Sequence, residues 1–126
     1  MKSPQQQIYD AVFKASLELG YKTLDYLPPH GESYPFVFVG EQFDQDRRTK
    51  LFIFGDVQQT VHIYHDYKKR RELTDMMNEL KRKMREIKRT ENFYVDCTGI
   101  ESQTLIDSDG TRTLLHGILE FEFTFH

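Results

Sequence analysis

Histidine side chains can bind metal ions and transfer protons, and two of the five in this sequence lie close together. His62 and His65 are three positions apart in an alternating apolar and polar segment that predicts a β-strand. Residues three apart in a strand point to opposite faces, so these imidazoles are not expected to chelate one metal ion. The others, His30, His116 and His126, are scattered. The sequence therefore predicts neither a metal site nor a cofactor site.

Nucleophilic catalysis would need a hydroxyl beside a base, and Ser102, His116 and Asp107 supply the residue types for such a triad. No nucleophile-elbow motif surrounds Ser102. Twenty Asp and Glu residues are available as acids, an abundance that singles out no catalytic pair. Two of them, Asp44 and Asp46, precede arginines in a polar stretch that is typical of a solvated loop. We therefore predict that the protein is not an enzyme.

Composition narrows the class of protein further. Cys97 is the only cysteine, so an internal disulfide and a cysteine-based zinc site are excluded; we predict a small buried side chain in a strand. No run of about 20 apolar residues is present, which excludes a membrane-spanning helix. The first residues lack the apolar stretch of a signal peptide, which favours a cytoplasmic protein. A length of 126 residues predicts one domain, residues 1–126.

A strongly basic segment follows the histidine-bearing strand. Residues 68–89 contain ten Lys and Arg against four Asp and Glu, a net charge of +6. The whole chain carries −3, so the remaining residues carry −9. This separation of charge favours docking onto charged partners or onto copies of the same chain.

Three interpretations fit the basic segment: a solvated helix face, a subunit or partner contact, and a nucleic-acid-binding face. Lysine and arginine bind nucleic acid by displacing counterions from phosphates. The pI near 5.9 argues against this binding, because the rest of the surface would repel the same polymer. The first four residues, 68–71, are all cations, and positive charge is mildly unfavourable at the start of a helix. This suggests that these side chains are held by partners outside the helix.

Two helices are predicted to position these side chains. Ser3, Pro4 and Gln6 are typical of a helix start, and Gly20 is suited to end the helix in a left-handed conformation. The second helix is predicted over 68–89. Its apolar stripe is interpreted as core and includes the methionines Met76, Met77 and Met84.

Strands are predicted over 34–40, 57–65, 93–106 and 119–125, with a short edge strand within 21–27. Polar residues without periodicity predict a loop or hairpin tip over 42–50, and 107–110 predicts a turn. The order of these elements predicts an α+β fold: one mostly antiparallel β-sheet with two α-helices packed on one face. Aromatic residues flank the 42–50 segment as possible interface anchors, or as continuations of the core strands: Phe43, Phe52 and Phe54.

Four segments resemble the tail completion, or tail terminator, proteins of long-tailed (siphovirus-type) bacteriophages and prophages. They are the opening helix at 4–12, the strand at 34–41 after a proline-bearing loop, the strand-to-helix junction at 59–67 followed by Arg70 or Arg71, and the closing strand at 114–123. The segments occur in the order found in that family, and the resemblance extends over most of the chain.

The resemblance implies a sheet with two packed helices, in agreement with the fold class predicted from the residues. It also implies a structural virion protein at the head–tail joint, assembled in the bacterial host cytoplasm. A ring, usually a hexamer, would cap the head-proximal end of the tail tube, stop its polymerisation and offer a joining surface to the head. Its partners would be other copies of itself, the major tail tube protein and a head-side connector protein. DNA would only pass through the lumen.

Two alternatives accompany this interpretation. One is another head–tail connector or head completion component, and the other is a small nucleic-acid-binding module that uses residues 68–89. A closed ring joins one patch of a subunit to a different patch of the next, and opposite charges supply such patches. We predict interface residues in the loop region and at the start of the long helix: Arg47, Arg48, Lys50, Phe52, Lys69, Arg70 and Arg71.

Overall fold

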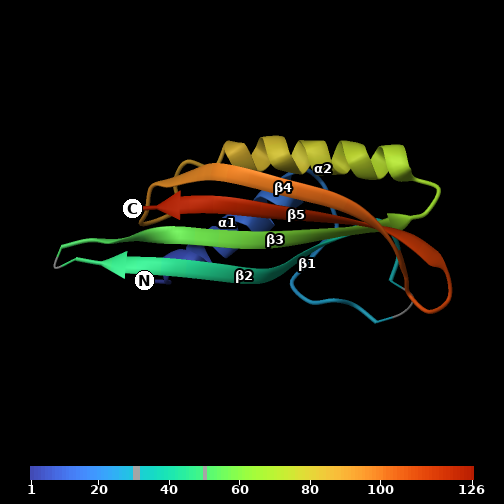
Figure 1. The fold of residues 1–126 in the computed structure, drawn as a ribbon, viewed down its shortest axis with the longest axis horizontal. Helices are drawn as coiled ribbons and strands as arrows, with labels where there is room; N and C mark the ends of the chain where they lie inside the picture. The colour runs from blue at the N-terminus through green and yellow to red at the C-terminus, as the bar shows by residue number, and fades with distance from the viewer. Residues whose placement is uncertain (30–31, 50) are drawn as a thin grey trace.

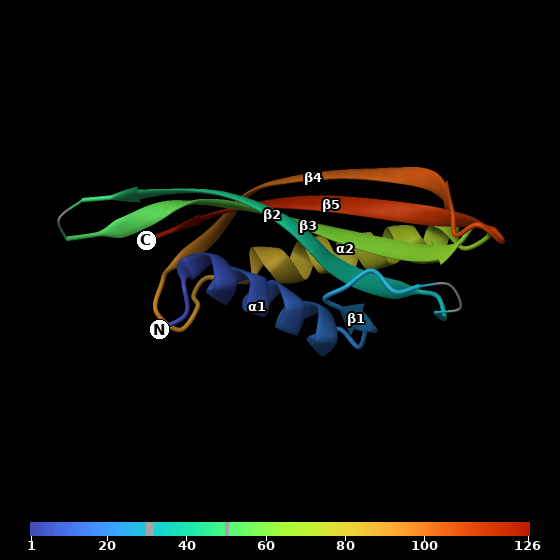
Figure 2. The same ribbon diagram turned by 90° about the horizontal axis from the view of Figure 1, so that it is seen from below.

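A single β-sheet with both helices on one face organises the protein, as Figure 2 shows in side view. The computed structural model describes residues 1–29, 32–49 and 51–126. In chain order the elements are α1 (Pro4–Glu18), β1 (Thr23–Leu24), β2 (Phe36–Arg48), β3 (Ile53–Asp66), α2 (Arg70–Arg85), β4 (Val95–Ser108) and β5 (Thr113–Phe125). The strand order is β1-β2-β3-β5-β4, and only β1 and β2 pair in parallel. The predicted α+β class and the helices on one face are confirmed.

Helix α1 begins and ends where the residue pattern predicts. The Ser3 hydroxyl accepts a hydrogen bond from the backbone N–H of Gln6 at 3.1 Å, which satisfies one of the free N–H groups at the helix start. Pro4 occupies the first helical position. Gly20 follows the helix with a φ of 88°, a conformation that glycine adopts without steric cost.

The core lies between the sheet and the two helices. Strand β5 contributes five large side chains to it, and α2 contributes an apolar stripe that contains the predicted methionines. Helix α2 approaches the sheet closely at Gly117 of β5. A Cβ added to this glycine would lie only 2.8 Å from the Met77 sulfur. The fully buried side chains of these two elements are Leu119, Phe121, Phe123, Phe125, Leu73, Leu80 and Met84.

Helix α2 is shorter than the predicted 68–89. It begins at Arg70, after a turn in which the Lys69 N–H donates to the Asp66 carbonyl at 3.0 Å. It ends at Arg85, because the chain then turns back and the Lys88 carbonyl accepts from the Val95 N–H at 2.9 Å. Part of the basic charge therefore lies in the connection to β4 and not on the helix.

The prediction of a loop over 42–50 is wrong for the described part of that segment. Strand β2 continues to Arg48, and a bulge between Val39 and Gln42 shifts its register against β3. Gln5 of α1 donates to Asp44 at 3.0 Å, and the strand is exposed from Phe43 to its end at Arg48, so polar residues are compatible with it. The hairpin of β2 and β3 therefore extends past the rest of the sheet as an arm (Figure 1). Lys50, one of the predicted interface residues, lies outside the described residues.

The predicted turn at 107–110 is displaced along the chain. Strand β4 continues through Ser108, and the turn follows over 109–112 with Gly110 at a φ of 92°. The Asp109 carboxylate stabilises this turn, because it accepts hydrogen bonds from the backbone N–H groups of Thr111 and Arg112, both at 2.9 Å.

Candidate assembly surfaces

The helix-free face of the sheet holds a cluster of titratable side chains from four strands. His62 and His65 point to opposite faces as predicted, but His62 Nδ1 lies 2.8 Å from His116 Nε2. At the two ends of this pair, Glu41 Oε1 lies 2.6 Å from His62 Nε2 and Asp107 Oδ2 lies 3.3 Å from His116 Nδ1. The description of His116 as scattered is therefore wrong. Strand β3 pairs with β5 in a register that places Tyr64 opposite His116, and this brings His116 close to His62.

The cluster does not form the triad of Ser102, His116 and Asp107. Ser102 pairs with Leu119 in the sheet, so it points to the other face from His116 and the triad does not form. Within the described ranges, no group of three or more His, Cys, Asp or Glu side chains is arranged to hold a metal ion. Cys97 is half-buried in β4, and burial raises the pKa of its thiol.

Burial affects the pKa values of His116 and Glu41 in this cluster. The pKa of His116 is lowered from its usual 6.5, because burial and the nearby His62 disfavour the imidazolium more than Asp107 favours it. Burial alone would raise the pKa of Glu41, but the hydrogen bonds from His62 and from the Glu41 backbone, with the charges of His62 and His116, together lower that pKa. Protonation of either group is therefore less favourable in the folded protein than in the unfolded chain, and acidification should lower the free energy of unfolding.

The lowered pKa of His116 predicts a loss of stability on mild acidification. The unfolded chain binds this proton first, so the free energy of unfolding should fall as the pH drops below about 6.5 and continue falling until the folded-state pKa is reached. His116→Phe keeps a ring against Tyr64 and should make this fall shallower. Urea unfolding at pH 7.5 and 5.5 measures the change in the free energy of unfolding between the two pH values. His126→Phe is the control for the loss of an exposed imidazole. Equal pH dependence of wild type and His116→Phe would contradict the assignment.

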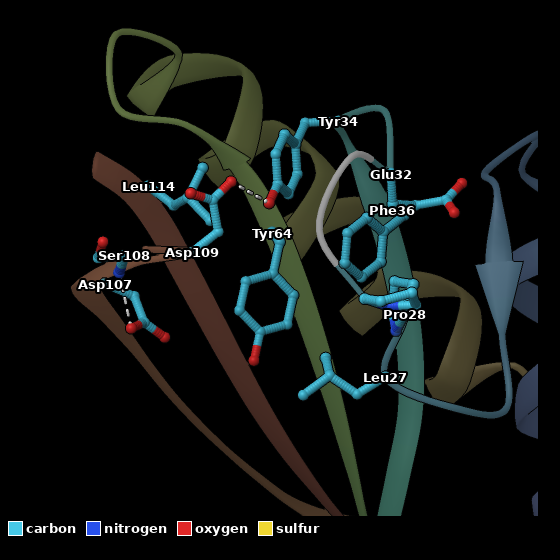
Figure 3. Close-up of a pocket in the computed structure, with 11 residues that line it drawn as sticks. Leu27, Pro28, Glu32, Tyr34, Phe36, Tyr64, Asp107, Ser108, Asp109 and Leu114 are labelled. Atoms are coloured by element: carbon cyan, nitrogen blue, oxygen red, sulfur yellow. Dashed lines mark hydrogen bonds between the residues drawn. The ribbon is translucent and has the colours of Figure 1, made fainter. Parts of the chain in front are cut away.

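A pocket lies at one end of the same face, between the loop before β2 and the β4–β5 hairpin (Figure 3). Its volume is about 250 Å³. Tyr34, Phe36 and Tyr64 form its aromatic wall, with successive ring centroids 5.5 and 5.2 Å apart. Carboxylates surround this wall, namely Glu32, Asp107 and Asp109. We name this site the acid–aromatic pocket.

Hydrogen bonds hold the walls of the acid–aromatic pocket in place. The Tyr34 hydroxyl donates to Asp109 Oδ2 at 3.0 Å, and the Arg112 guanidinium lies 4.5 Å from the centroid of the Tyr34 ring. Hydrogen bonds from Thr111, Arg112 and Tyr34 lower the pKa of Asp109, so this carboxylate stays charged. The site therefore combines fixed negative charge with aromatic surface, which suits a cationic or amphipathic side chain.

The arm formed by β2 and β3 exposes large apolar side chains. The exposed fractions are 66% for Phe43, 64% for Phe52 and 36% for Phe54. Arg47 and Arg48 are also exposed, and neither forms an ion pair with any residue that the structure describes. These aromatic residues therefore do not continue the core, and the arm tip is both apolar and basic.

The predicted interface residues fall into two separate places. Strand β3 connects the arm to the start of α2, and its 14 residues span about 45 Å at ~3.3 Å per residue. Lys69, Arg70 and Arg71 are exposed at the far end of that strand, close to the acid–aromatic pocket end of the molecule (Figure 1). Arg47, Arg48 and Phe52 lie at the opposite end.

Several other cations of the basic segment have partners. Arg82 pairs with Glu86 at 3.0 Å, Lys88 pairs with Asp96 at 3.2 Å, and Arg89 lies over the Tyr94 ring. By contrast, Arg70 and Arg71 pair with no carboxylate in the described part of the chain. The methionine stripe is buried, which confirms its assignment to the core. No helix within 1–29, 32–49 and 51–126 is long and apolar enough to cross a bilayer.

The fold of this chain has a counterpart among solved structures. No protein-family model and no curated protein match this chain. A solved structure titled "Virion of native gene transfer agent (GTA) particle" contains a chain of the same fold, with a TM-score of 0.67. The match covers 98% of this chain and 94% of that chain at 11% sequence identity. Identity this low shows a shared fold alone.

Proposed function

We propose that this protein is a structural component of a phage-like virion and acts as a tail terminator at the head–tail joint. The observation that carries the proposal is the match of nearly the whole chain to a component of a gene transfer agent virion. The arm adds support, because it exposes several large apolar side chains, and exposed apolar patches mark interaction sites. In this role a ring of copies, expected to be a hexamer, caps the tail tube and binds the head-side connector.

Two exposed surfaces serve assembly in this proposal. The arm tip with Arg47, Arg48 and Phe52 forms one, and the start of α2 with Lys69, Arg70 and Arg71 forms the other. The tail tube protein, the head-side connector and neighbouring copies are the partners. DNA passes through the lumen of the ring and makes no sequence-specific contact. A head completion component is the alternative structural role, and the unpaired cations of α2 favour a nucleic-acid-binding module as the second candidate.

Deleting the gene from its phage or prophage tests the proposed role directly. A terminator predicts DNA-filled heads lying apart from tails of abnormal or variable length in electron micrographs of the lysate. Tails of normal length beside separate heads would assign the protein to a head-side connector. Intact virions would contradict any structural role and would favour the nucleic-acid-binding module.

Complementing the deletion with Arg70→Glu/Arg71→Glu tests the start of α2. Acidic side chains suit the first turn of a helix, so the variant should keep or gain ~0.3–1 kcal/mol of stability. Infectious particles should nevertheless fall by about tenfold or more, since ~1.4 kcal/mol of lost contact energy already weakens binding tenfold. Plaque titre and thermal unfolding measure the two effects. The control Lys81→Glu/Arg85→Glu makes the same charge change elsewhere on α2, and equal titres of both variants would contradict this surface.

A further inference from the structure

We propose that the arm tip of one copy docks into the acid–aromatic pocket of a second copy of this chain. The inference rests on the proposed ring and names the two surfaces that close it. The arm tip consists of Arg47, Arg48, Leu51 and Phe52, and the pocket is the site shown in Figure 3. The end of the β2–β3 hairpin and the end of the β4–β5 hairpin, beside which the pocket lies, are at opposite ends of the long axis of the molecule (Figure 1).

The arm tip has the composition of an inserting segment. Leu51 is 84% exposed and Phe52 64% exposed. The Thr49 hydroxyl accepts a hydrogen bond from the Phe52 N–H at 3.0 Å, which holds the connection between the strands. Arg47 and Arg48 add two positive charges that no described carboxylate neutralises. Aromatic and arginine side chains together dominate the binding energy of protein interfaces.

The pocket is complementary to that tip in both shape and charge. Leu27, Pro28 and Leu114 add apolar surface to the aromatic wall, and Leu27 itself is 57% exposed. A volume of about 250 Å³ is below the ~300–1,000 Å³ of small-molecule sites, so it suits one or two side chains. Glu32 is paired with Lys22, and Arg112 lies beside Asp66 and Asp109, with its guanidinium over the Tyr34 ring. Asp107, whose described partner is His116, is therefore the carboxylate that favours an arginine from the arm.

Placing complementary surfaces at opposite ends makes the contact heterologous. Each copy then offers its arm to one neighbour and its pocket to the other, and such contacts form a ring when the rotation between neighbours closes. Two copies that exchanged arms reciprocally would stop at a dimer. The pairing is therefore compatible with the proposed ring, and the measured assembly must be larger than two copies.

Reversing the charge of each surface separately tests this pairing. The arm variant is Arg47→Glu/Arg48→Glu, and the pocket variant is Leu27→Arg/Glu32→Arg. All four side chains are exposed or half-buried, so both variants should fold, which circular dichroism and thermal unfolding check. Sedimentation velocity measures assembly of the full chain, alone and with purified tail tubes.

We expect each variant alone to remain monomeric under conditions in which the wild type forms rings. Mixed in equal amounts, the two variants should form rings of alternating copies, because the acidic arm then meets the basic pocket and the unchanged arm meets the unchanged pocket. Arg47→Gln/Arg48→Gln is the control for the arm and should not rescue the pocket variant. Rings formed by either charge-reversed variant alone would overturn the pairing and leave the proposed ring intact. A wild type that remains monomeric even on tail tubes would overturn the ring and the pairing together.

Discussion

Replacing Phe121 with alanine is expected to lower the free energy of unfolding by ~3–5 kcal/mol, the cost of removing a buried phenyl ring from a well-packed core. Phe121 has no exposed surface and lies in β5 between Gln59 of β3 and Ile100 of β4. Its ring packs against that of Phe123, with centroids 6.3 Å apart. Neighbouring strands fix its backbone on both sides, so the sheet cannot collapse into the space that the ring leaves. Urea unfolding at neutral pH measures the loss.

Phe43→Ala is the matched control, because it makes the same chemical change on the exposed arm. Phe43 is 66% exposed, so its truncation should change stability by less than about 0.5 kcal/mol. A small loss at Phe121, or equal losses at the two positions, would show that the sheet–helix interface is not the stabilising core.

Gln59→Leu is expected to have the next largest effect, although it makes the core more apolar. Gln59 is fully buried, and its Nε2 donates to the carbonyls of Gly40 and Glu41 at 3.1 and 3.2 Å. These carbonyls lie in the β2 bulge, where the ladder to β3 is interrupted. The Gln59 side-chain oxygen also accepts from Gln42 Nε2 at 3.1 Å. The side chain therefore replaces the strand hydrogen bonds that the bulge removes.

Leucine would leave those groups unpaired at a cost on the order of 2–4 kcal/mol, since each unsatisfied buried group costs ~1–3 kcal/mol. Gln58→Leu is the control, because that neighbour points to the helix-free face and donates only to Glu120, at 3.0 Å. Chemical unfolding compares the two variants, and hydrogen exchange at Gly40 and Glu41 should report opening of the bulge. A neutral or stabilising Gln59→Leu would show that water satisfies the bulge carbonyls equally well.

Local patterns in the sequence predicted the elements that depend on neighbouring residues. The Ser3 cap, the left-handed Gly20 and the apolar alternation of β5 are each determined within a few positions, so reading the residues in order was sufficient. The same patterns failed where the tertiary structure opposes local preference. Residues 42–48 are polar and aperiodic, but pairing with β3 makes them a strand despite their composition.

The sites depended on contacts between residues far apart in the chain. Opposite faces for His62 and His65 followed from the two-residue period of a strand, whereas the contact of His62 with His116 required the register of β3 against β5. The acid–aromatic pocket likewise joins the segment before β2 to the β4–β5 hairpin, and no spacing in the sequence indicates it. Pairing of distant strands is the physical reason, since it sets which side chains share a face.

Composition and periodicity by themselves determined the fold class, the two helices and the separation of charge along the chain. The tertiary structure alone decided that the basic and apolar arm tip and the acid–aromatic pocket lie at opposite ends of the molecule. Strand β3 is the cause, because it runs the length of the sheet from the arm to Asp66 and so separates the two surfaces.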